Sequence, residues 1–333
     1  MFGFYNTVLT VDATTRSFGR TRISDETLRR TLGGKGLATA LLLENNPPGV
    51  EPLHPDNRLI FAVGPATGTR IFGSCRHGVF SKSPQTGFYS ESYSGGTVAE
   101  HMARTGYDAI EITGAADEPV WIEIGDEDAF FHPAGDLWGL DTFETEERIK
   151  AWITEHRPAA NNCGVVCIGP AGENLVSFAV IENDRWRSAG RTGVGAVMGS
   201  KKIKGIAFRG SRQKEVADPE LVRNFAKALM QQAREDTGVK NYKNFGTPML
   251  VDIMNHVGGF PTRYWHRGTA DHRESINAGA LHERCEVTPH ACLKCFIACG
   301  RLSTVKGGRH KGLTCEGPEY ETIYAFGGLC EVA

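Results

Sequence analysis

The distribution of apolar and polar residues predicts short strands that alternate with helices over residues 1–211. Short stretches that are continuously apolar, or apolar at every second position, are typical of strands. They occur at 6–12, 18–23, 58–63, 108–113, 120–124, 163–168, 175–181 and 203–208. Helical spacing occurs at 24–30, 37–44 and 142–155, with Ser24 and Thr142 as the predicted N-cap residues. We therefore expect a first domain in which strands and helices are interleaved.

The pattern changes after the polar segment 209–215. Asp218-Pro219 is expected to begin a long amphipathic helix that extends to about Arg234, and a further helix is predicted at 247–257. A cysteine-rich loop follows these helices. These features place a domain boundary between a first domain, residues 1–211, and a mostly α-helical second domain, residues 212–333.

Charge and apolar content exclude several classes of partner. The 333 residues include 37 Lys and Arg and 39 Asp and Glu, giving a net charge of −2, so the chain has no general attraction for nucleic acid or anionic membranes. No apolar run is long enough to span a bilayer, and the first residues lack the features of a signal peptide. We expect a cytoplasmic, reducing location and neither a nucleic-acid nor a membrane partner.

Three of the nine cysteines form the most specific single motif. Cys292, Cys295 and Cys299 have the spacing CxxCxxxC, which lets one loop present three thiolates to a compact inorganic centre. An iron–sulfur cubane and a tetrahedral zinc ion both fit this spacing, and unliganded thiols are the third alternative. A zinc site could be completed by one of three nearby residues, Cys285, His290 or Cys315. A complete disulfide framework is excluded because the cysteine count is odd.

Glycine-rich turns near strand ends are candidate anion sites. Arg185, Arg187 and Arg191 surround a glycine-rich helix start, which offers guanidinium groups and free backbone amides to phosphate oxygens. A surface arginine cluster on a helix of small residues is the alternative. The segment Gly33-Gly34-Lys35-Gly36 differs from a phosphate loop because glycine follows the lysine, and either an anion contact or a plain turn fits it.

Many short motifs follow one another along the whole chain. They are Gly33-Gly34-Lys35-Gly36, Gly73-Ser74-Cys75-Arg76, Lys82-Ser83-Pro84, Ser94-Gly95-Gly96, Gly106-Tyr107-Asp108-Ala109, Gly169-Pro170-Ala171-Gly172-Glu173, Ala189-Gly190-Arg191, Gly195-Ala196-Val197-Met198-Gly199-Ser200-Lys201, the cysteine triplet and Glu316-Gly317-Pro318-Glu319-Tyr320-Glu321. Taken together and in this order, they resemble the tungsten-containing aldehyde:ferredoxin oxidoreductase family. No single motif carries this resemblance alone.

The resemblance implies an α+β fold. Its N-terminal domain would consist of two β-sheets in a pseudo-twofold arrangement that form the base of a pterin site, followed by a mostly helical and incomplete second domain. It also implies a tungsten or molybdenum ion held by two pterins, a magnesium ion that bridges the pterin phosphates, and a [4Fe-4S] cluster. The ligands of the cluster would be Cys292, Cys295 and Cys299.

Eight residues match positions at which the family binds its pterin cofactor: Arg76, Ser94, Gly95, Gly96, Arg187, Ala189, Gly190 and Arg191. The resemblance implies that Arg76 lies between the pterin and the cluster, and that the segment from Arg187 to Arg191 holds the pterin phosphates. At the position where the family often contacts magnesium through Asn, this chain has Tyr93, which offers no amide oxygen.

The family chain is usually much longer and carries its fourth cluster cysteine in the distal part. We therefore expect this sequence to be an N-terminal portion whose other half is supplied separately. Cys315 and Cys330 are alternative fourth ligands. A homo-oligomer is also expected, because a missing half would leave apolar surface exposed.

The expected activity is oxidation of a small aldehyde to a carboxylic acid, with electrons passing through the cluster to ferredoxin or another electron-transfer protein. Glu316 is the first candidate for a carboxylate that takes a proton beside the metal, and Glu319 is the second. Either residue could instead cap or salt-link a helix. The alternative function is a truncated, non-catalytic iron–sulfur binding or electron-transfer module. Neither the aldehyde nor the choice between tungsten and molybdenum follows from the sequence.

Overall fold

The structure is a computed structural model that describes residues 1–158 and 162–332. They form two compact units, Met1–Arg223 and Asn224–Ala333. The polar segment 209–215 belongs to the first unit, because its backbone and side chains are bonded there. Arg212 N donates to Arg104 O (2.9 Å), and Lys214 Nζ donates to Gly64 O (2.7 Å). The compact unit therefore extends beyond residue 211, where the sequence placed the boundary.

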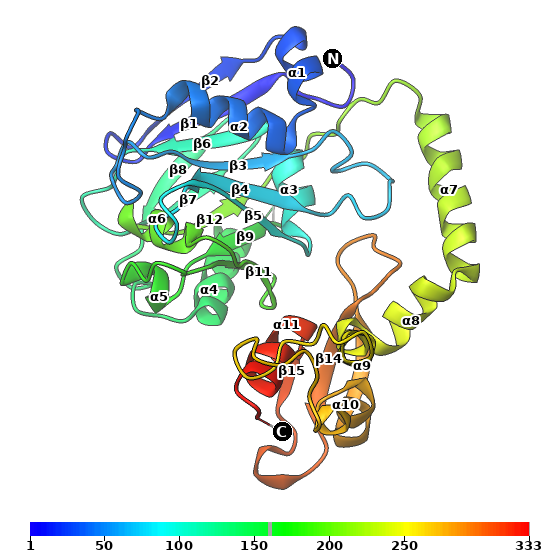
Figure 1. The fold of residues 1–333 in the computed structure, drawn as a ribbon. Coiled ribbons are helices and arrows are strands. Elements are labelled where there is room, and N and C mark those ends of the chain that lie inside the picture. Colours follow the sequence, from blue (N-terminus) through cyan, green and yellow to red (C-terminus); the bar gives the residue numbers. More distant parts are fainter. Residues whose placement is uncertain (159–161, 333) are drawn as a thin grey trace. The chain divides into compact units, whose positions relative to one another are not determined.

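Two six-stranded sheets form the first unit (Figure 1). The first sheet contains β1 (Thr7–Asp12), β2 (Ser17–Arg22), β3 (Leu59–Val63), β4 (His77–Lys82), β5 (Tyr89–Ser94) and β6 (Ala109–Thr113). The second contains β7 (Val120–Ile124), β8 (Ala129–Pro133), β9 (Gly164–Cys167), β10 (Ile181–Asn183), β11 (Arg187–Ala189) and β12 (Ile203–Phe208). Their spatial orders are β2-β1-β6-β3-β4-β5 and β11-β10-β9-β12-β7-β8.

The second sheet repeats the topology of the first. In the first sheet only β1 and β6 pair in parallel, and in the second only β7 and β12 do; all other neighbours are antiparallel. Strands β7 to β12 therefore occupy, in chain order, the positions of β1 to β6. This agreement confirms the expected fold of two sheets related by a pseudo-twofold arrangement, although the sequence itself shows no repeat.

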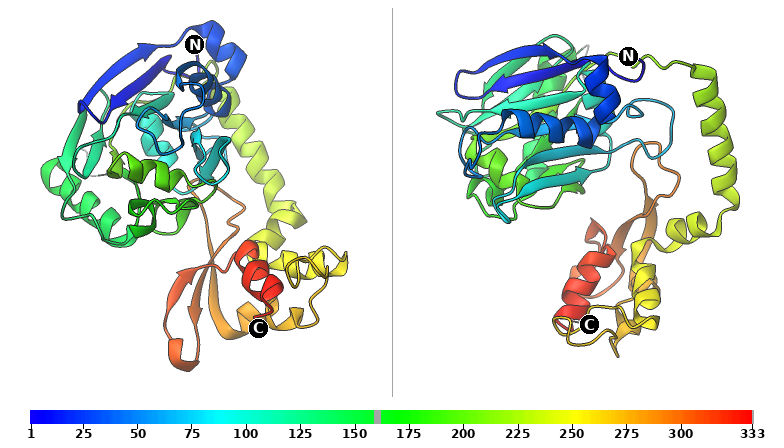
Figure 2. Two further views of the ribbon diagram at one scale, coloured as in Figure 1. Left: turned by 60° about the vertical axis from the view of Figure 1, so that its left-hand side comes forward. Right: turned by 45° about the horizontal axis from the view of Figure 1, so that its top comes forward.

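Helices of the first unit lie both outside and between the sheets (Figure 2). They are α1 (Asp25–Thr31), α2 (Gly34–Asn45), α3 (Val98–Arg104), α4 (Thr142–His156), α5 (Pro170–Glu173) and α6 (Val194–Ser200). Leu37 of α2 packs on the outer face of the first sheet, and Ile149 of α4 packs on the outer face of the second. Met102 of α3 and Met198 of α6 are fully buried in the core that the two sheets share. The second half thus places its helices as the first half does.

Two local predictions for the first unit were wrong. The predicted strand at 175–181 is mostly a turn, in which Leu175 has a left-handed backbone (φ 57°), and β10 begins only at Ile181. The N-cap of α4 is Asp141, whose Oδ1 accepts from Glu144 N at 2.8 Å, whereas Thr142 is the first helical residue. The Ser24 cap was correct, because its side chain accepts from Thr27 N.

Helices are the most frequent elements of the second unit. Its helices are α7 (Pro219–Glu235), which spans the boundary between the units, α8 (Thr237–Phe245), α9 (Leu250–His256), α10 (Ala278–Arg284) and α11 (Tyr320–Ile323). Short 3-10 helices lie at η2 (Thr247–Met249), η3 (Arg273–Ser275) and η4 (Gly308–His310), and a π-helix at η5 (Tyr324–Leu329). Val251, Phe260, Ala270 and Ile323 form its small core.

The second unit also contains a three-stranded antiparallel sheet that the sequence did not predict. Its strands are β13 (Cys285–His290), β14 (Gly300–Val305) and β15 (Thr314–Glu316), with β14 in the centre. The hairpin of β13 and β14 carries the cysteine-rich loop. None of the helices in the described parts of the chain is both long enough and apolar enough to cross a membrane.

Candidate functional site

The glycine turn after β5 is bonded to the end of β10. Ser94 is buried, and its Oγ donates to Asn183 Oδ1 at 2.5 Å. Asn183 Nδ2 in turn donates to Gly95 O at 3.0 Å. The structure therefore joins two segments that are far apart in the sequence. The first contains residues expected to bind the cofactor, and the second directly precedes such residues.

Asp184 fixes the conformation of this turn. Its carboxylate accepts from Thr97 N and from Thr97 Oγ1, both at 2.6 Å. Burial opposes ionisation of Asp184, but the hydrogen bonds from Thr97 outweigh it and lower its pKa. Gly96 has φ +89°, and a Cβ at this position would lie 2.1 Å from Asp184 Oδ2. Only glycine fits between the turn and the carboxylate.

The segment from Arg187 to Arg191 lies beside the same strand. Residues 187–189 form β11, and Arg191 N donates to Ser92 Oγ at 2.9 Å. Ser83 Oγ donates to Thr192 O at 2.8 Å, which ties the end of the segment to the first sheet. Gly190 and Arg191 are exposed, so the backbone and the guanidinium group there can reach a ligand. Of the predicted pterin-binding residues, 94–96 and 187–191 are thus brought together.

These two turns are topologically equivalent. Ser94-Gly95-Gly96 connects β5 to α3, and Ala189-Gly190-Arg191 connects β11 to α6, the matching strand and helix of the second sheet. Each half of the repeated topology therefore contributes one glycine-containing turn. Two similar turns side by side fit a ligand with two similar anionic groups, because backbone amides and guanidinium groups both bind phosphate oxygens.

Arg76 is exposed directly before β4. Its neighbour His77 pairs with Ser94 across β4 and β5 and is 1% exposed. Burial, assisted by the charge of Arg76, lowers the pKa of His77 to about 4, although Asp184 acts in the opposite direction. Neither ring nitrogen of His77 has a hydrogen-bond partner in the described parts of the chain. A neutral imidazole therefore lies at the edge of the turn region.

The Gly33–Gly36 segment takes no part in this arrangement. Lys35 Nζ forms an ion pair with Glu91 at 2.6 Å. A Cβ at Gly36 would lie 2.0 Å from Thr31 O, so this glycine allows α1 and α2 to approach closely. The contacts favour the plain-turn interpretation over an anion contact.

The three cysteines of the second unit lie on the loop between β13 and β14. Cys292, Cys295 and Cys299 are all partly exposed, and Cys295 N donates to Cys292 O at 3.0 Å. Lys294 and Ala298 have left-handed backbones (φ 56° and 48°), which turn the chain sharply between the thiols. The described residues contain no group of three or more His, Cys, Asp or Glu side chains already arranged for a metal ion. The cluster ligands therefore stay a prediction.

Arg301 holds the base of this loop. It is 1% exposed, and its guanidinium donates to Gly300 O and Lys243 O, each at 2.7 Å, and also to Ala298 O. These bonds connect the loop to the end of α8. Three reduced thiols on a loop anchored in this way have the chemistry that an iron–sulfur cluster requires.

Glu316 lies beside the start of the cysteine loop. It ends β15, its side chain is 4% exposed, and its Oε1 is 3.0 Å from His290 Nδ1. Glu319 is bonded differently, because its Oε2 accepts from Thr247 Oγ1, which also accepts from Tyr320 N at 3.0 Å. Glu319 thus joins η2 to α11. Glu316 contacts the residue at the start of the cysteine loop, whereas Glu319 is bonded to Thr247, whose neighbour Gly246 lies against Cys299 at the end of the loop.

Sequence reasoning missed Asn183, Asp184 and His77. An available signal was the Asn-Asp pair, which is typical of turns and directly precedes the arginine-rich segment. His77 carried no such signal, because only burial of its unpartnered nitrogens draws attention to it.

The chain matches two family models that together cover most of it. Residues 8–210 match "Aldehyde ferredoxin oxidoreductase, N-terminal domain", and residues 224–333 match "Aldehyde ferredoxin oxidoreductase, domains 2 & 3". The chain is 38% identical over 328 residues to a tungsten-containing aldehyde ferredoxin oxidoreductase of Thermococcus kodakarensis, covering 98% of this chain and 53% of the relative. A protein with the same description from Pyrococcus furiosus is 37% identical with the same coverage.

A more distant relative and a solved structure extend this comparison. The relative is an aliphatic sulfonate oxidoreductase, WOR-like subunit, of Pyrococcus furiosus, which is 28% identical over 338 residues. The structure is the active site complex BamBC of benzoyl coenzyme A reductase, with a TM-score of 0.78 and 29% identity, covering 94% of this chain and 49% of that chain. The chain therefore spans about half the length of the curated relatives it matches.

Proposed function

The chain belongs to the aldehyde ferredoxin oxidoreductase family, and we propose that it forms the cofactor-binding portion of an oxidoreductase that converts aldehydes to carboxylic acids. The observation that carries this proposal is the meeting of the two equivalent glycine turns, Ser94–Gly96 and Ala189–Arg191, at the ends of β5 and β11. The tungsten-containing relatives support a pterin-held tungsten or molybdenum as the cofactor.

The turns suit the phosphate groups of a pterin cofactor. Gly95 and Gly96 would allow close approach of the backbone, and Arg187 and Arg191 would supply guanidinium groups for the phosphate oxygens. Ser94, Ala189 and Gly190 would complete the contacts, with Arg76 reaching the same cofactor. A magnesium ion would bridge the phosphates. Because the Tyr93 hydroxyl is bonded to Glu91 (3.2 Å), this ion would depend on other groups.

The cysteine loop would hold a [4Fe-4S] cluster through Cys292, Cys295 and Cys299. Its fourth ligand would come from the part of the relatives that this chain does not match. Cys315 and Cys330 are the alternatives within this chain. When bound, these groups would supply the redox chemistry of aldehyde oxidation and of electron transfer to ferredoxin.

Glu316 is proposed as the proton acceptor. Oxidation of an aldehyde with water to a carboxylate releases three protons with its two electrons, so a base near the reacting carbon assists it. The support for Glu316 is its near-complete burial and its contact with His290, which could receive a proton from it. Glu319 is the second candidate, although its bond to Thr247 gives it a structural role.

Metal content tests the proposal most directly. The full chain would be purified without oxygen, alone and together with a chain that supplies the remaining half, and tungsten, molybdenum, iron and zinc would be measured per chain by mass spectrometry. Cys295→Ser should remove the iron and its charge-transfer absorbance, whereas Cys285→Ser, a partly exposed cysteine outside the triplet, should retain both. Unchanged iron in Cys295→Ser would contradict the ligand assignment. Zinc without iron in the unmodified chain would overturn the proposal of an iron–sulfur cluster.

The three thiols on one anchored loop support a second candidate function, since they suit an iron–sulfur cluster without a pterin. The chain would then be a non-catalytic iron–sulfur binding or electron-transfer module, or would act only with a separate second half or as a homo-oligomer. Aldehyde-dependent reduction of a viologen dye distinguishes the two functions. Activity from this chain alone would exclude the non-catalytic module, and its absence in the presence of bound tungsten would favour it.

A further inference from the structure

A groove with a volume of about 510 Å³ lies between α2 and the hairpin of β4 and β5 in the first unit. The second half of α2 and the segment 46–50 form one side, and residues of β4, β5 and their connecting turn form the other. This volume falls within the range of small-molecule sites, which are mostly apolar with a few placed polar groups. None of the described residues that line the groove belongs to the glycine turns or the cysteine loop.

Apolar side chains form most of both sides of the groove. Leu42, which is 6% exposed, and Val50 lie on the α2 side, where Leu43 is 82% exposed. Phe88 lines the opposite side and is 77% exposed. Large apolar side chains in contact with water favour a ligand that covers them, because the burial of apolar area is favourable. The groove therefore suits a ligand with an apolar part.

The uncharged polar side chains of the groove are bonded within the protein. Thr39 Oγ1 of α2 lies 2.9 Å from the Tyr89 hydroxyl of β5. Asn46 Oδ1 accepts from Arg58 N at 2.8 Å, and Ser81 Oγ donates to Arg58 O at 2.7 Å. These hydrogen bonds connect the two sides of the groove to each other and to the neighbouring strand. The side chains that form them have a structural role.

Lys82 differs from the other side chains of the groove. Among the described residues that line it, Lys82 alone has a charged side chain. Its Nζ donates to Val50 O at 2.7 Å, but an ammonium group has three donors, and no carboxylate in the described parts of the chain forms an ion pair with it. Lys35 of α2, by contrast, is paired with Glu91 at 2.6 Å. Lys82 therefore leaves donors of a partly buried cation available to an anion.

We propose that this groove binds small carboxylic acids with an aliphatic chain. The carboxylate is bonded to Lys82 Nζ, and the chain lies between the α2 side and Phe88. A carboxylate fits better than a phosphate monoester, because the groove offers one cation and a phosphate monoester carries nearly two negative charges. The site is independent of the pterin and cluster proposals, since it shares no residue with them.

Ligand-observed NMR of matched compounds tests the site on the full chain. Octanoate should bind saturably below its micelle-forming concentration. Octanamide has the same chain but no charge, and it should bind about fivefold more weakly because it lacks the ion pair with Lys82. Hexanoate should also bind more weakly than octanoate, by up to about fourfold for each methylene group that it lacks. Equal affinities for octanoate and octanamide, or no saturable binding of octanoate, would overturn the proposal.

Variants separate the groove from general adhesion of the compounds. Lys82→Met should lose the preference for octanoate over octanamide, and Lys82→Arg should keep it. Phe88→Ala should weaken the binding of both compounds alike by removing part of one side. The matched controls are Lys35→Met, which removes a lysine outside the groove, and Phe178→Ala, which removes an aromatic ring that is 65% exposed elsewhere on the unit. Both controls should bind as the wild type does.

Two further results would refute the assignment. Circular dichroism would first show that each variant is folded. An undiminished preference in Lys82→Met, or an unchanged affinity in Phe88→Ala, would then place the binding elsewhere. A second copy of the chain could instead cover the exposed apolar side chains. In that case octanoate would fail to bind and Phe88→Ala would lower the oligomeric state in sedimentation experiments, which would overturn the proposal of a carboxylic acid.

Discussion

Replacing Gly96 by alanine tests whether the turn after β5 is shaped by its contact with Asp184. The backbone of Gly96 has φ +89°, and an alanine Cβ would lie 2.1 Å from Asp184 Oδ2 and 3.0 Å from Asn183 Nδ2. No rotation of the methyl group relieves contacts this short. Either the turn or the aspartate must move, and both movements weaken the hydrogen bonds between Asp184 and Thr97.

The expected decrease in the free energy of unfolding of Gly96→Ala has two contributions. The left-handed backbone costs a residue with a Cβ about 1–2 kcal/mol. Each hydrogen bond to an ionised carboxylate contributes about 1.5–3 kcal/mol. If only one of the two bonds from Thr97 is lost, Gly96→Ala should therefore destabilise the first unit by about 2.5–5 kcal/mol.

Gly87→Ala is the matched control. Gly87 has φ +74°, but a Cβ there meets no atom within 4 Å, so only the backbone contribution applies. Urea unfolding would be followed by tryptophan fluorescence, because four of the five tryptophans, Trp121, Trp138, Trp152 and Trp186, lie in the first unit. The Gly96 variant should unfold at a clearly lower urea concentration than the Gly87 variant. Equal midpoints would refute the role assigned to Asp184.

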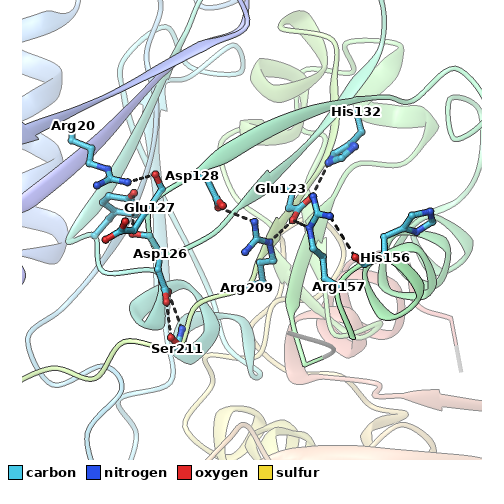
Figure 3. A network of polar contacts seen from close by, with 11 residues as sticks. Arg20, Glu123, Asp126, Glu127, Asp128, His132, His156, Arg157, Arg209 and Ser211 are labelled. Atoms are coloured by element: carbon cyan, nitrogen blue, oxygen red, sulfur yellow. Dashed lines mark hydrogen bonds and ion pairs between the residues drawn. The ribbon is translucent and has the colours of Figure 1, made fainter. Parts of the chain in front are cut away.

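Three further predictions concern single carboxylates and a lysine. Glu316→Gln should retain bound tungsten and iron but lose aldehyde-dependent dye reduction, and full activity with this variant would exclude it as the base. Burial opposes ionisation of Glu123, but the hydrogen bonds to its carboxylate outweigh it and lower the pKa to about 2 (Figure 3). Its ionised form therefore stabilises the folded chain fully above the ordinary pKa of a glutamate, and this stabilisation is lost as the pH falls through about 2. Glu123→Gln should lack this contribution of about 3 kcal/mol to the free energy of unfolding, measured by acid unfolding. Burial lowers the pKa of Lys201 to about 7, so between this value and its ordinary pKa the unfolded chain binds more protons and stability rises with pH. Lys201→Met should abolish that rise in urea titrations at neutral and alkaline pH, and an unchanged slope would contradict it.

Most strands of the first unit could be predicted, because short apolar runs in the local sequence indicate buried strands. The strand at 203–208 was found with its observed bounds, since it has only one charged residue, Lys204, and is buried on both faces. The stretch at 175–181 has similar residues, yet it forms a turn in which Leu175 and Phe178 are exposed, and only Ile181 belongs to a strand. Composition alone does not distinguish these two cases.

The sheet of the second unit could not be predicted from its strands. β13 contains Pro289 and alternates between partly exposed and exposed positions, so it shows neither a buried run nor a clear apolar face. It exists because β14 pairs with it along its whole length. The contact between Glu316 and His290 depends on this pairing, since β15 joins the other edge of β14.

The sequence by itself determined the features that depend on residues close together in the chain. It determined the cysteine spacing, the glycine-containing turns, the Ser24 cap and several of the buried strands, because each depends on a few residues within one turn or one strand. Only the tertiary structure decided which of these segments meet. Asp184 reaches Thr97 across 87 positions of the chain, and the repeat of β1–β6 by β7–β12 becomes visible only in the pairing of strands. The reason is physical: such contacts follow from the register and packing of whole sheets, which depend on the summed burial of both halves and not on any single segment.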